Sequence, residues 1–229
     1  MIKRLGYKLL IDKLQEGKVV LLYGPRRVGK TTLLNQLYNE YKNKEKIKFV
    51  NGESRIIQEE LSVKTIEGLK MFVGEASVLI VDEAQNVPNI GMALKMIVDN
   101  VKGIKVVASG SASFSLSNKV GEPLIGRKKT VRLFPVSVKE IVDTWSIEFY
   151  KEFFENHIIF GGYPELFSIK DKESKIEYLH EVVDSYLCKD ILELEYLRNS
   201  KKIRDLLTLL AFQIGREVSF SELASNLSL

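Results

Sequence analysis

Residues 19–34 have the sequence VVLLYGPRRVGKTTLL, in which a short apolar run leads into a glycine-containing loop and then into an amphipathic helix. Within this stretch, Gly24–Thr31 matches the pattern G-x-x-x-x-G-K-[ST]. Gly24 and Gly29 allow the backbone to bend so that successive N–H groups point inward at phosphate oxygens. The helix that starts near Lys30 adds the positive end of its dipole. The stretch therefore predicts a phosphate-binding loop between a buried strand and a helix.

Several side chains of this loop have expected roles. The Lys30 ammonium would reach the β- and γ-phosphates of a nucleoside triphosphate, and the Thr31 hydroxyl is placed to ligate Mg²⁺. Arg26 and Arg27 either contact phosphate or a neighbouring molecule, or they are exposed loop residues. The residues that we expect to bind the nucleotide in this loop are Gly24, Pro25, Arg26, Arg27, Val28, Gly29, Lys30, Thr31 and Thr32.

Two carboxylates, Asp82 and Glu83, directly follow the apolar run Val78–Val81. Open α/β sheets bind ligands at the carboxyl ends of their strands, and consecutive side chains of a strand point in different directions. We therefore expect Asp82 to hold Mg²⁺ together with Thr31, and Glu83 to polarise the attacking water as a general base. A solvated acidic turn is the alternative. The pair favours water as the acceptor, and hence hydrolysis.

Two further features follow the acidic pair along the chain. Ser109 and Ser111 come after the apolar run Val106–Ala108, and one of them would act as a polar sensor of the γ-phosphate if this strand lies between the first and third strands. A serine-rich turn is the alternative. Arg127 stands just before the fifth apolar run, where it would stabilise the transferring phosphoryl group in its own site or in a neighbouring subunit's site. A solvated basic turn is the alternative for this arginine.

The first 135 residues alternate between strand-like and helix-like segments. Apolar runs without polar alternation suit a parallel sheet that is covered on both faces. Amphipathic helices are predicted between these runs at Thr31–Tyr41 and Ala93–Val101. We expect a doubly wound α/β layer with five parallel strands. The strands are predicted at Val19–Tyr23, Ile47–Val50, Val78–Val81, Val106–Ala108 and Val131–Phe134.

The C-terminal part differs in composition, since no proline and only one glycine, Gly215, follow residue 170. This shift predicts an all-helical part with a boundary near 135–165. Ser219 with Glu222 resembles a capping box that starts a last helix. Helical spacing is found in Val138–Phe160, with a break near Trp145, in Ile176–Leu197 and in Ile203–Ile214.

The composition of the 229 residues excludes several classes of protein. Apolar residues make up 45% and charged residues 28%, which argues against disorder, and no uncharged apolar stretch approaches the roughly 20 residues of a membrane span. One cysteine, Cys188, excludes an internal disulfide, and we expect it to be a small core residue. The net charge of +4 permits a nucleic-acid partner without requiring one. We expect a soluble cytoplasmic protein without a membrane partner.

The motifs in combination resemble a known family. GPRRVGKTTL at 24–33, LIVDEAQ at 79–85, SGSAS at 109–113, Gly126-Arg127 with LFPVS at 133–137, and GGYPE at 161–165 occur in this order. Over roughly residues 1–200 the chain resembles the prokaryotic AAA-like P-loop ATPases of the archaeal-ATPase type. The resemblance implies ATP and ADP as the nucleotides, and a sensor strand inserted between the phosphate-loop strand and the acidic-pair strand.

The resemblance also implies a domain order. We expect a P-loop ATPase core over residues 1–135, a small all-helical lid over 136–215, and over 216–229 the start of a winged-helix-like segment that is truncated here. Gly162–Pro164 looks like the Gly-x-Pro motif that packs near the adenine in related signalling ATPases, so Pro164 is expected to contact the nucleotide. A tight turn between domains is the alternative for this motif.

These observations support two main functions. The first is Mg²⁺-dependent ATP binding and hydrolysis that drives a conformational change of attached domains or partners. The alternative is a nucleotide-controlled switch, or a DNA-associated regulatory module, with little turnover of its own. DNA is weakly supported, because no basic helix with interleaved aromatic residues is present. A protein partner, or self-association through a downstream domain, is also expected. A small-molecule kinase fits least, since the acidic pair suits hydrolysis.

Overall fold

A computed structural model describes residues 2–62, 65–111, 123–184 and 200–227 of the chain. The chain divides into two units, Met1–Lys175 and Ile176–Leu229. Three predicted features lie outside the described residues, namely the C-terminal part of the helix predicted over 176–197, the environment of Cys188, and Ala112 and Ser113 of the serine-rich segment. The domain boundaries expected near residues 135 and 215 stay a prediction.

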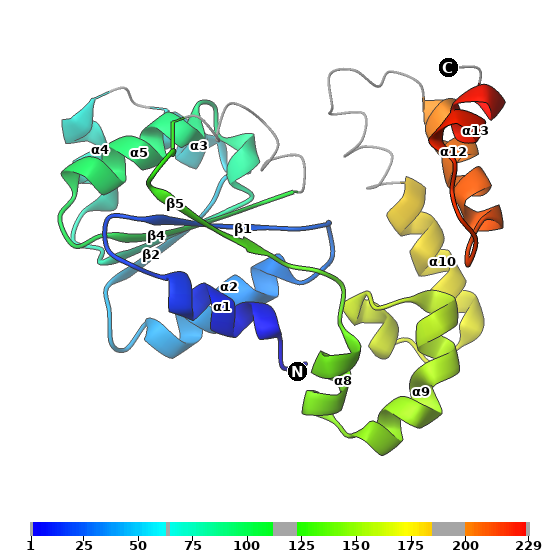
Figure 1. Cartoon of the computed structure of the whole chain (residues 1–229). Helices are drawn as coiled ribbons and strands as arrows, with labels where there is room; N and C mark the ends of the chain where they lie inside the picture. The colour runs from blue at the N-terminus through cyan, green and yellow to red at the C-terminus, as the bar shows by residue number, and fades with distance from the viewer. Residues whose placement is uncertain (1, 63–64, 112–122, 185–199, 228–229) are drawn as a thin grey trace. The chain divides into compact units, whose positions relative to one another are not determined.

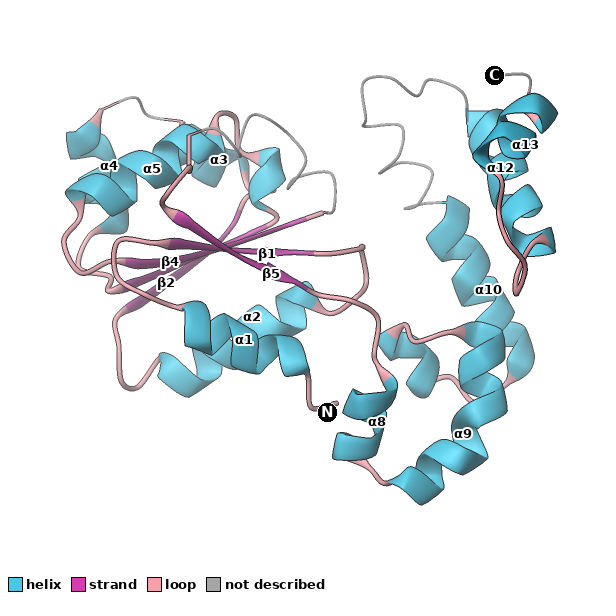
Figure 2. Cartoon of the chain, in the orientation of Figure 1, coloured by secondary structure: helices cyan, strands magenta, loops and turns pink. Residues whose placement is uncertain are grey.

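The first unit is built around a sheet of five strands (Figure 2). The strands are β1 (Val19–Tyr23), β2 (Ile47–Asn51), β3 (Val78–Asp82), β4 (Lys105–Gly110) and β5 (Lys128–Arg132). Their order across the sheet is β2-β3-β4-β1-β5, and every neighbouring pair is parallel. The predicted α/β fold is therefore confirmed, and β4 lies between the phosphate-loop strand and the acidic-pair strand.

Helices cover both faces of the sheet (Figure 1). Successive side chains of β1 enter two different cores, because Val20 and Leu22 pack with Leu33 on one face, whereas Val19 and Leu21 belong to the core on the other face. This double burial explains why the strands are continuously apolar rather than alternating. One face carries α1 (Leu5–Lys13) and α2 (Lys30–Tyr41), and the other carries α3 (Arg55–Leu61), α4 (Ile66–Val73), the short 3-10 helix η1 (Ala84–Asn86) and α5 (Ile90–Asn100).

The fifth strand begins three residues and ends two residues earlier than the apolar run at 131–134 predicts. Among the described strands, β5 pairs only with β1, so it is an edge strand, and Val131 is its one buried residue. An edge strand has one unpaired side and tolerates polar and charged residues. The apolar residues after it belong to the exit from the sheet, where the Leu133 N–H donates to the Tyr23 carbonyl at 2.8 Å. The apolar run therefore predicted the existence of this strand but placed it too late.

Helices follow the sheet, as the sequence predicts. The break expected near Trp145 separates two helices, and Ser146 caps the second one by accepting a hydrogen bond from the Phe149 N–H at 3.1 Å. The first of them begins with a full capping box between Ser137 and Glu140. The elements of this part are α8 (Val138–Thr144), α9 (Ile147–Phe160), the 3-10 helix η2 (Pro164–Phe167) and α10 (Lys172–Val182), which crosses the boundary between the units.

The second unit contains the end of α10 together with α12 (Ser200–Phe212) and α13 (Phe220–Asn226). Ser219 caps α13 by accepting a hydrogen bond from the Glu222 N–H at 3.3 Å, which confirms the predicted helix start. Arg204 of α12 forms an ion pair with Asp184 at 3.0 Å. None of the described helices has the length and apolar content that a membrane crossing requires.

Candidate functional site

The predicted phosphate loop joins the carboxyl end of β1 to the start of α2. A Cβ atom on Gly24 would lie 2.2 Å from the Leu133 carbonyl oxygen, so only glycine permits this close approach of the exit from β5. Gly29 adopts a left-handed backbone conformation with φ of +96°, which glycine accepts without strain. The two glycines of the motif are therefore required for different reasons, a close contact and a backbone angle.

Lys30 folds back under the loop. Its side chain is buried, and its Nζ donates hydrogen bonds to the carbonyl oxygens of Gly24 at 3.0 Å and Pro25 at 2.9 Å. A buried ammonium group needs such oxygen partners, because an unsatisfied buried charge is costly. The contacts hold the positive charge inside the curve of the loop, which is where the sequence predicts the phosphates.

Three predicted site residues from different elements meet at the end of the sheet. The Thr31 hydroxyl of α2 donates to Asp82 Oδ2 at 2.7 Å, and the Ser109 hydroxyl of β4 donates to Asp82 Oδ1. Asp82 is 4% exposed and Ser109 is fully buried. The cluster exists because β4 lies directly beside β3, so that the ends of the two strands bring Asp82 and Ser109 together. Of the two candidate serines, Ser109 contacts both acidic residues, since it donates to Asp82 Oδ1 and accepts from the Glu83 N–H.

Glu83 turns away from Asp82 through an unusual backbone conformation. Its φ and ψ of 49° and 43° are left-handed, which is uncommon for a residue other than glycine and occurs often at functional sites. Its N–H donates to Ser109 Oγ at 3.0 Å and to Asp82 Oδ1 at 3.2 Å. Its carboxylate accepts a hydrogen bond from Gln85 Nε2. The two carboxylates therefore have different hydrogen-bond partners, Thr31 and Ser109 for Asp82 and Gln85 for Glu83.

The donor set of this cluster fits Mg²⁺. The Thr31 hydroxyl oxygen and Asp82 Oδ2 lie 2.7 Å apart and are the kind of oxygen ligand that Mg²⁺ prefers. Mg²⁺ is usually bound in proteins by one or two carboxylates while it keeps several waters, so one hydroxyl and one carboxylate are sufficient protein ligands.

Two other predicted residues have different surroundings. The second candidate serine, Ser111, is buried and stands directly after the end of β4. Arg127 lies at the amino end of the strands, whereas the phosphate loop follows the carboxyl end of β1. The Arg127 carbonyl accepts a hydrogen bond from the Val19 N–H at 2.9 Å. A strand of this length separates the two ends by about 16 Å, at about 3.3 Å per residue. The Arg127 guanidinium instead pairs with Asp99, and this hydrogen bond raises the pKa of the arginine.

The position of Arg127 bears on the two predicted possibilities. Arg127 lies at the amino end of the strands and pairs with Asp99, whereas the phosphate loop follows the carboxyl end of β1. Its action on the nucleotide of its own chain is not supported by this placement and stays a prediction. Its action on the site of a neighbouring subunit stays a prediction.

The segment after α9 returns to the phosphate loop. Pro164 Cγ lies 3.9 Å from the position that a Cβ atom on Gly29 would occupy. Next to it, Glu165 forms an ion pair with Arg27 of the loop at 3.6 Å. The Gly162–Pro164 motif is thus brought beside the residues that are expected to bind phosphate. The sequence left the partner of Arg27 open, and the structure pairs this arginine with Glu165.

Some residues near the site carried no recognised signal in the sequence. Gly52 follows β2, and a Cβ atom there would lie 2.6 Å from the Glu83 carbonyl oxygen. The glycine therefore permits the backbone of Glu83 to approach this closely. Arg4 forms an ion pair with Glu140 and donates a hydrogen bond to the Val28 carbonyl of the phosphate loop. The spacing of Ser137 and Glu140 matches a capping box and would have revealed the helix start. No local pattern identifies Arg4.

A phosphate loop after the first strand, an acidic pair after the third and an inserted fourth strand define a P-loop nucleoside-triphosphatase fold. The chain belongs to the AAA domain family, whose model matches residues 16–142. A second model, described only as a domain of unknown function, matches residues 151–229. The predicted membership among the AAA-like P-loop proteins is thus confirmed.

The curated relatives are uncharacterized proteins. One from Methanocaldococcus jannaschii is 28% identical over 228 residues, which covers 94% of this chain and 51% of the relative. One from Mycobacterium tuberculosis is 27% identical over 217 residues, which covers 93% of this chain and 45% of the relative. The chain therefore spans about half the length of these relatives.

Solved structures show a distant likeness. The AMPPCP-bound DnaA from Aquifex aeolicus is 18% identical, with a TM-score of 0.41, over 91% of this chain and 67% of that chain. The DnaC helicase loader is 14% identical, with a TM-score of 0.42, over 58% of this chain and 93% of that chain.

Proposed function

We propose that this chain binds ATP and hydrolyses it to ADP and phosphate with the help of Mg²⁺. The observation that carries the proposal is the hydrogen-bonded cluster of Thr31, Asp82, Ser109 and Glu83 beside the phosphate loop. These residues come from three separate elements of the family's fold. A purely structural end of a sheet would not need two carboxylates, a strained backbone and a buried hydroxyl at one point.

Binding of the triphosphate is assigned to the loop and Lys30. The loop between Gly24 and Lys30 supplies backbone N–H groups, and the start of α2 adds its positive dipole end. Lys30 Nζ now donates to two loop carbonyls, and a phosphate oxygen in the same curve would accept from it in their place. This exchange costs little, because one oxygen partner replaces another.

Thr31 and Asp82 would hold Mg²⁺. The bound ion would neutralise negative charge on the phosphates. The direct hydrogen bond between the two side chains keeps both oxygens on the same side of the sheet end before any ion arrives. Ser109 fixes the other carboxylate oxygen of Asp82, so the carboxylate cannot rotate freely.

Glu83 is the proposed general base. Its carboxylate would accept a proton from the attacking water while the water oxygen forms a bond to the γ-phosphorus and the bond to the ADP oxygen breaks. The Ser109 hydroxyl accepts from the Glu83 N–H and donates to Asp82, and it thereby fixes the spacing between the base and the metal ligand. Ser109 would sense the γ-phosphate indirectly, through its hydrogen bonds to the proposed metal ligand Asp82 and the proposed base Glu83.

Pro164 is proposed to lie near the adenine, since it packs beside the phosphate loop. The ion pair between Arg27 and Glu165 joins the same two segments. A change in the loop on binding or hydrolysis would therefore move the segment after α9. We propose that attached domains or partners respond to this movement.

ATP hydrolysis by the unmodified chain, Lys30→Ala, Glu83→Gln and Glu75→Gln tests the proposal. Affinity is measured by calorimetry with a non-hydrolysable ATP analogue, and turnover is measured under single-turnover and steady-state conditions. Lys30→Ala should lose binding. Glu83→Gln should bind but turn over roughly 10²–10⁴-fold more slowly. Glu75→Gln is a matched carboxyl-to-amide control at an exposed position, and it should change neither quantity.

Two results would contradict the proposal. Absence of any ATP binding by the unmodified chain would refute the nucleotide site. Tight binding without turnover, unaffected by Glu83→Gln, would refute the role of the base and would favour a nucleotide-controlled switch.

A further inference from the structure

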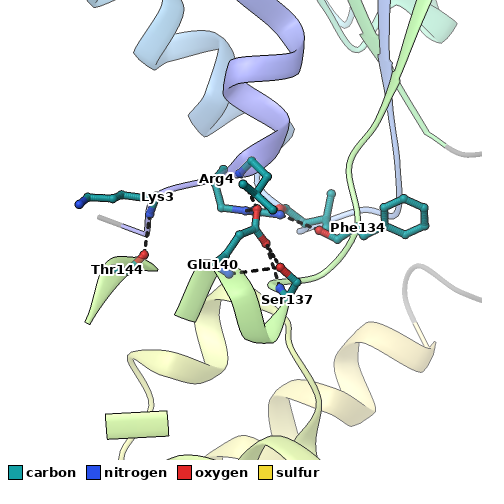
Figure 3. A network of polar contacts seen from close by, with 8 residues as sticks. Lys3, Arg4, Phe134, Ser137, Glu140 and Thr144 are labelled. Atoms are coloured by element: carbon teal, nitrogen blue, oxygen red, sulfur yellow. Dashed lines mark hydrogen bonds and ion pairs between the residues drawn. The ribbon is translucent and has the colours of Figure 1, made fainter. Parts of the chain in front are cut away.

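Arg4, which precedes α1, contacts three separate parts of the first unit (Figure 3). Its Nε pairs with Glu140 Oε1 of α8 at 3.1 Å, its Nη1 donates to the Val28 carbonyl of the phosphate loop at 2.8 Å, and its Nη2 donates to the Phe134 carbonyl at 2.6 Å. Each of the three guanidinium nitrogens thus has its own oxygen partner. A fixed planar fork of this kind holds its partners at defined positions.

Glu140 is held as firmly as Arg4. Oε1 also accepts from the Leu5 N–H at 2.8 Å, while Oε2 accepts from the Ser137 N–H at 2.9 Å and from the Ser137 hydroxyl at 3.1 Å. The side chains of Arg4 and Glu140 are only 9% and 6% exposed. In addition, the Lys3 N–H donates to Thr144 Oγ1 at the other end of α8 (Figure 3). The start of the chain is therefore attached along the whole of this helix.

The contact with Val28 affects the phosphate loop directly. The carbonyl of Val28 and the N–H of Gly29 belong to one planar trans peptide group, so they point in opposite directions. Because Arg4 holds the Val28 carbonyl, the Gly29 N–H points away from the Arg4 guanidinium. Arg4 Nη1 also lies 3.3 Å from the position of a Cβ atom on Gly29, so a larger residue there would disturb the contact.

We propose that Arg4 is a positioning residue of the nucleotide site: it orients the Val28–Gly29 peptide group for phosphate binding and, through Glu140, links the state of the loop to helix α8. This inference rests on the proposed binding of ATP. When phosphate binds to the Gly29 N–H, the Val28–Gly29 peptide group is held from both sides. A shift of this peptide group would then reach Glu140 of α8 through the buried Arg4 side chain.

A merely structural role for the ion pair makes a different prediction. Buried ion pairs are weak evidence for stability, and their replacement by uncharged groups of similar volume is often neutral. If Arg4 served only to hold α1 against α8, removal of both charges together would leave nucleotide binding intact. If Arg4 orients the loop, binding weakens even when no unpaired charge is left behind.

Three variants separate these roles. Arg4→Lys keeps the charge but replaces three donors in a fork with one nitrogen. The double variant Arg4→Met with Glu140→Gln removes both charges, and glutamine still suits the capping box. Lys13→Met is the matched control, because Lys13 of α1 also donates to a distant carbonyl, that of Thr130, at 2.7 Å, without contact to the loop.

Affinity for ATP and for a non-hydrolysable analogue is measured by calorimetry, and stability without nucleotide is measured by urea denaturation. We expect the Kd to rise roughly tenfold in Arg4→Lys and in the double variant, a size typical of mutations within a coupled network, and to stay unchanged in Lys13→Met. Hydrogen exchange gives a second readout. ATP should slow exchange of the α8 amides in the unmodified chain but not in the double variant, while the response of α5 stays the same in both.

Each outcome decides the question. If the unmodified chain binds ATP and both Arg4 variants bind it with the same Kd and the same α8 protection, the inference is overturned while the proposed function stands. If the unmodified chain does not bind ATP, the proposed function fails and this inference fails with it. A weakened Kd in Arg4→Lys at unchanged urea stability supports a positioning role directly.

Discussion

Replacement of Ser109 by alanine tests the central cluster most directly. Ser109 is fully buried, donates to Asp82 Oδ1 and accepts from the Glu83 N–H at 3.0 Å. The substitution removes one oxygen atom and leaves almost no cavity. Any effect therefore reports on the two hydrogen bonds and not on packing.

The size of the effect follows from these two bonds. A hydrogen bond to a charged group contributes about 1.5–3 kcal/mol to stability. The Glu83 N–H keeps a second acceptor in Asp82 Oδ1 at 3.2 Å, so its loss is only partial. We expect Ser109→Ala to lower the free energy of unfolding by about 2–3 kcal/mol. Turnover should fall roughly a hundredfold, as is typical when a catalytic group is displaced by about 1 Å.

Ser77→Ala provides the matched control. The Ser77 hydroxyl also donates to a carboxylate, Glu45 Oε2 at 2.9 Å, but Ser77 is only half-buried and lies just before β3, at the opposite end of this strand from Asp82. It should cost no more than about 0.5–1.5 kcal/mol and leave turnover unchanged. Urea denaturation gives the stabilities, and single-turnover hydrolysis gives the rates.

The reasoning is refuted if Ser109→Ala loses no more stability than Ser77→Ala and hydrolyses ATP at the unmodified rate. In that case Ser109 fills space beside Asp82 but does not organise the acidic pair. A loss of stability with normal turnover would refute only the catalytic part of the argument.

Other substitutions test separate features. Gly24→Ala should lower the free energy of unfolding by about 1–3 kcal/mol and abolish ATP binding, because its Cβ atom would lie 2.2 Å from the Leu133 carbonyl oxygen; thermal unfolding and calorimetry measure the two effects. The hydrogen bond from Lys105 holds the pKa of Glu45 below its ordinary value of 4.5, so the stabilisation is present above about pH 4.5 and is lost as the pH falls below it. Glu45→Gln should therefore destabilise the chain at pH 7, and its difference from the unmodified chain should shrink below pH 4.5 in urea denaturation at a series of pH values; a difference that stays constant would exclude this linkage. Arg127→Ala should leave the Kd for ATP unchanged, since the side chain lies at the opposite edge of the sheet, and a clear loss of affinity in calorimetry would contradict this placement.

The contacts among Thr31, Asp82 and their neighbours at the end of the sheet were predictable because their signals are local. The loop Gly24–Thr31 carries its glycines, lysine and hydroxyl within eight residues. Asp82 and Glu83 end an apolar run, and the meeting of Thr31 with Asp82 follows from strands that end at one edge. The contact between Ser109 and Asp82 needed the structure, because the sequence shows only that Ser109 and Ser111 stand near the end of one apolar run.

Other features were beyond local patterns. Arg4 and Glu140 are 136 positions apart, and neither stands in a motif that points to the other. β5 was placed too late because an edge strand with one buried residue has little apolar signal. The placement of Arg127 away from the phosphate loop has a topological reason. A residue directly before a parallel strand lies at the amino ends of the strands, whereas open α/β sheets bind ligands at the carboxyl ends.

The charge of β5 also affects how copies of this chain can meet. Within the described residues β5 is at the edge of the sheet, so one side of its backbone has no strand partner there. The strand carries Lys128, Lys129 and Arg132. Two copies that joined their sheets at this edge would bring these cations against one another, and like charges directly opposite across strands are destabilising. Lysine on an edge strand is one of the means by which natural proteins avoid such pairing. The basic strand thus disfavours edge-to-edge pairing of two copies at β5.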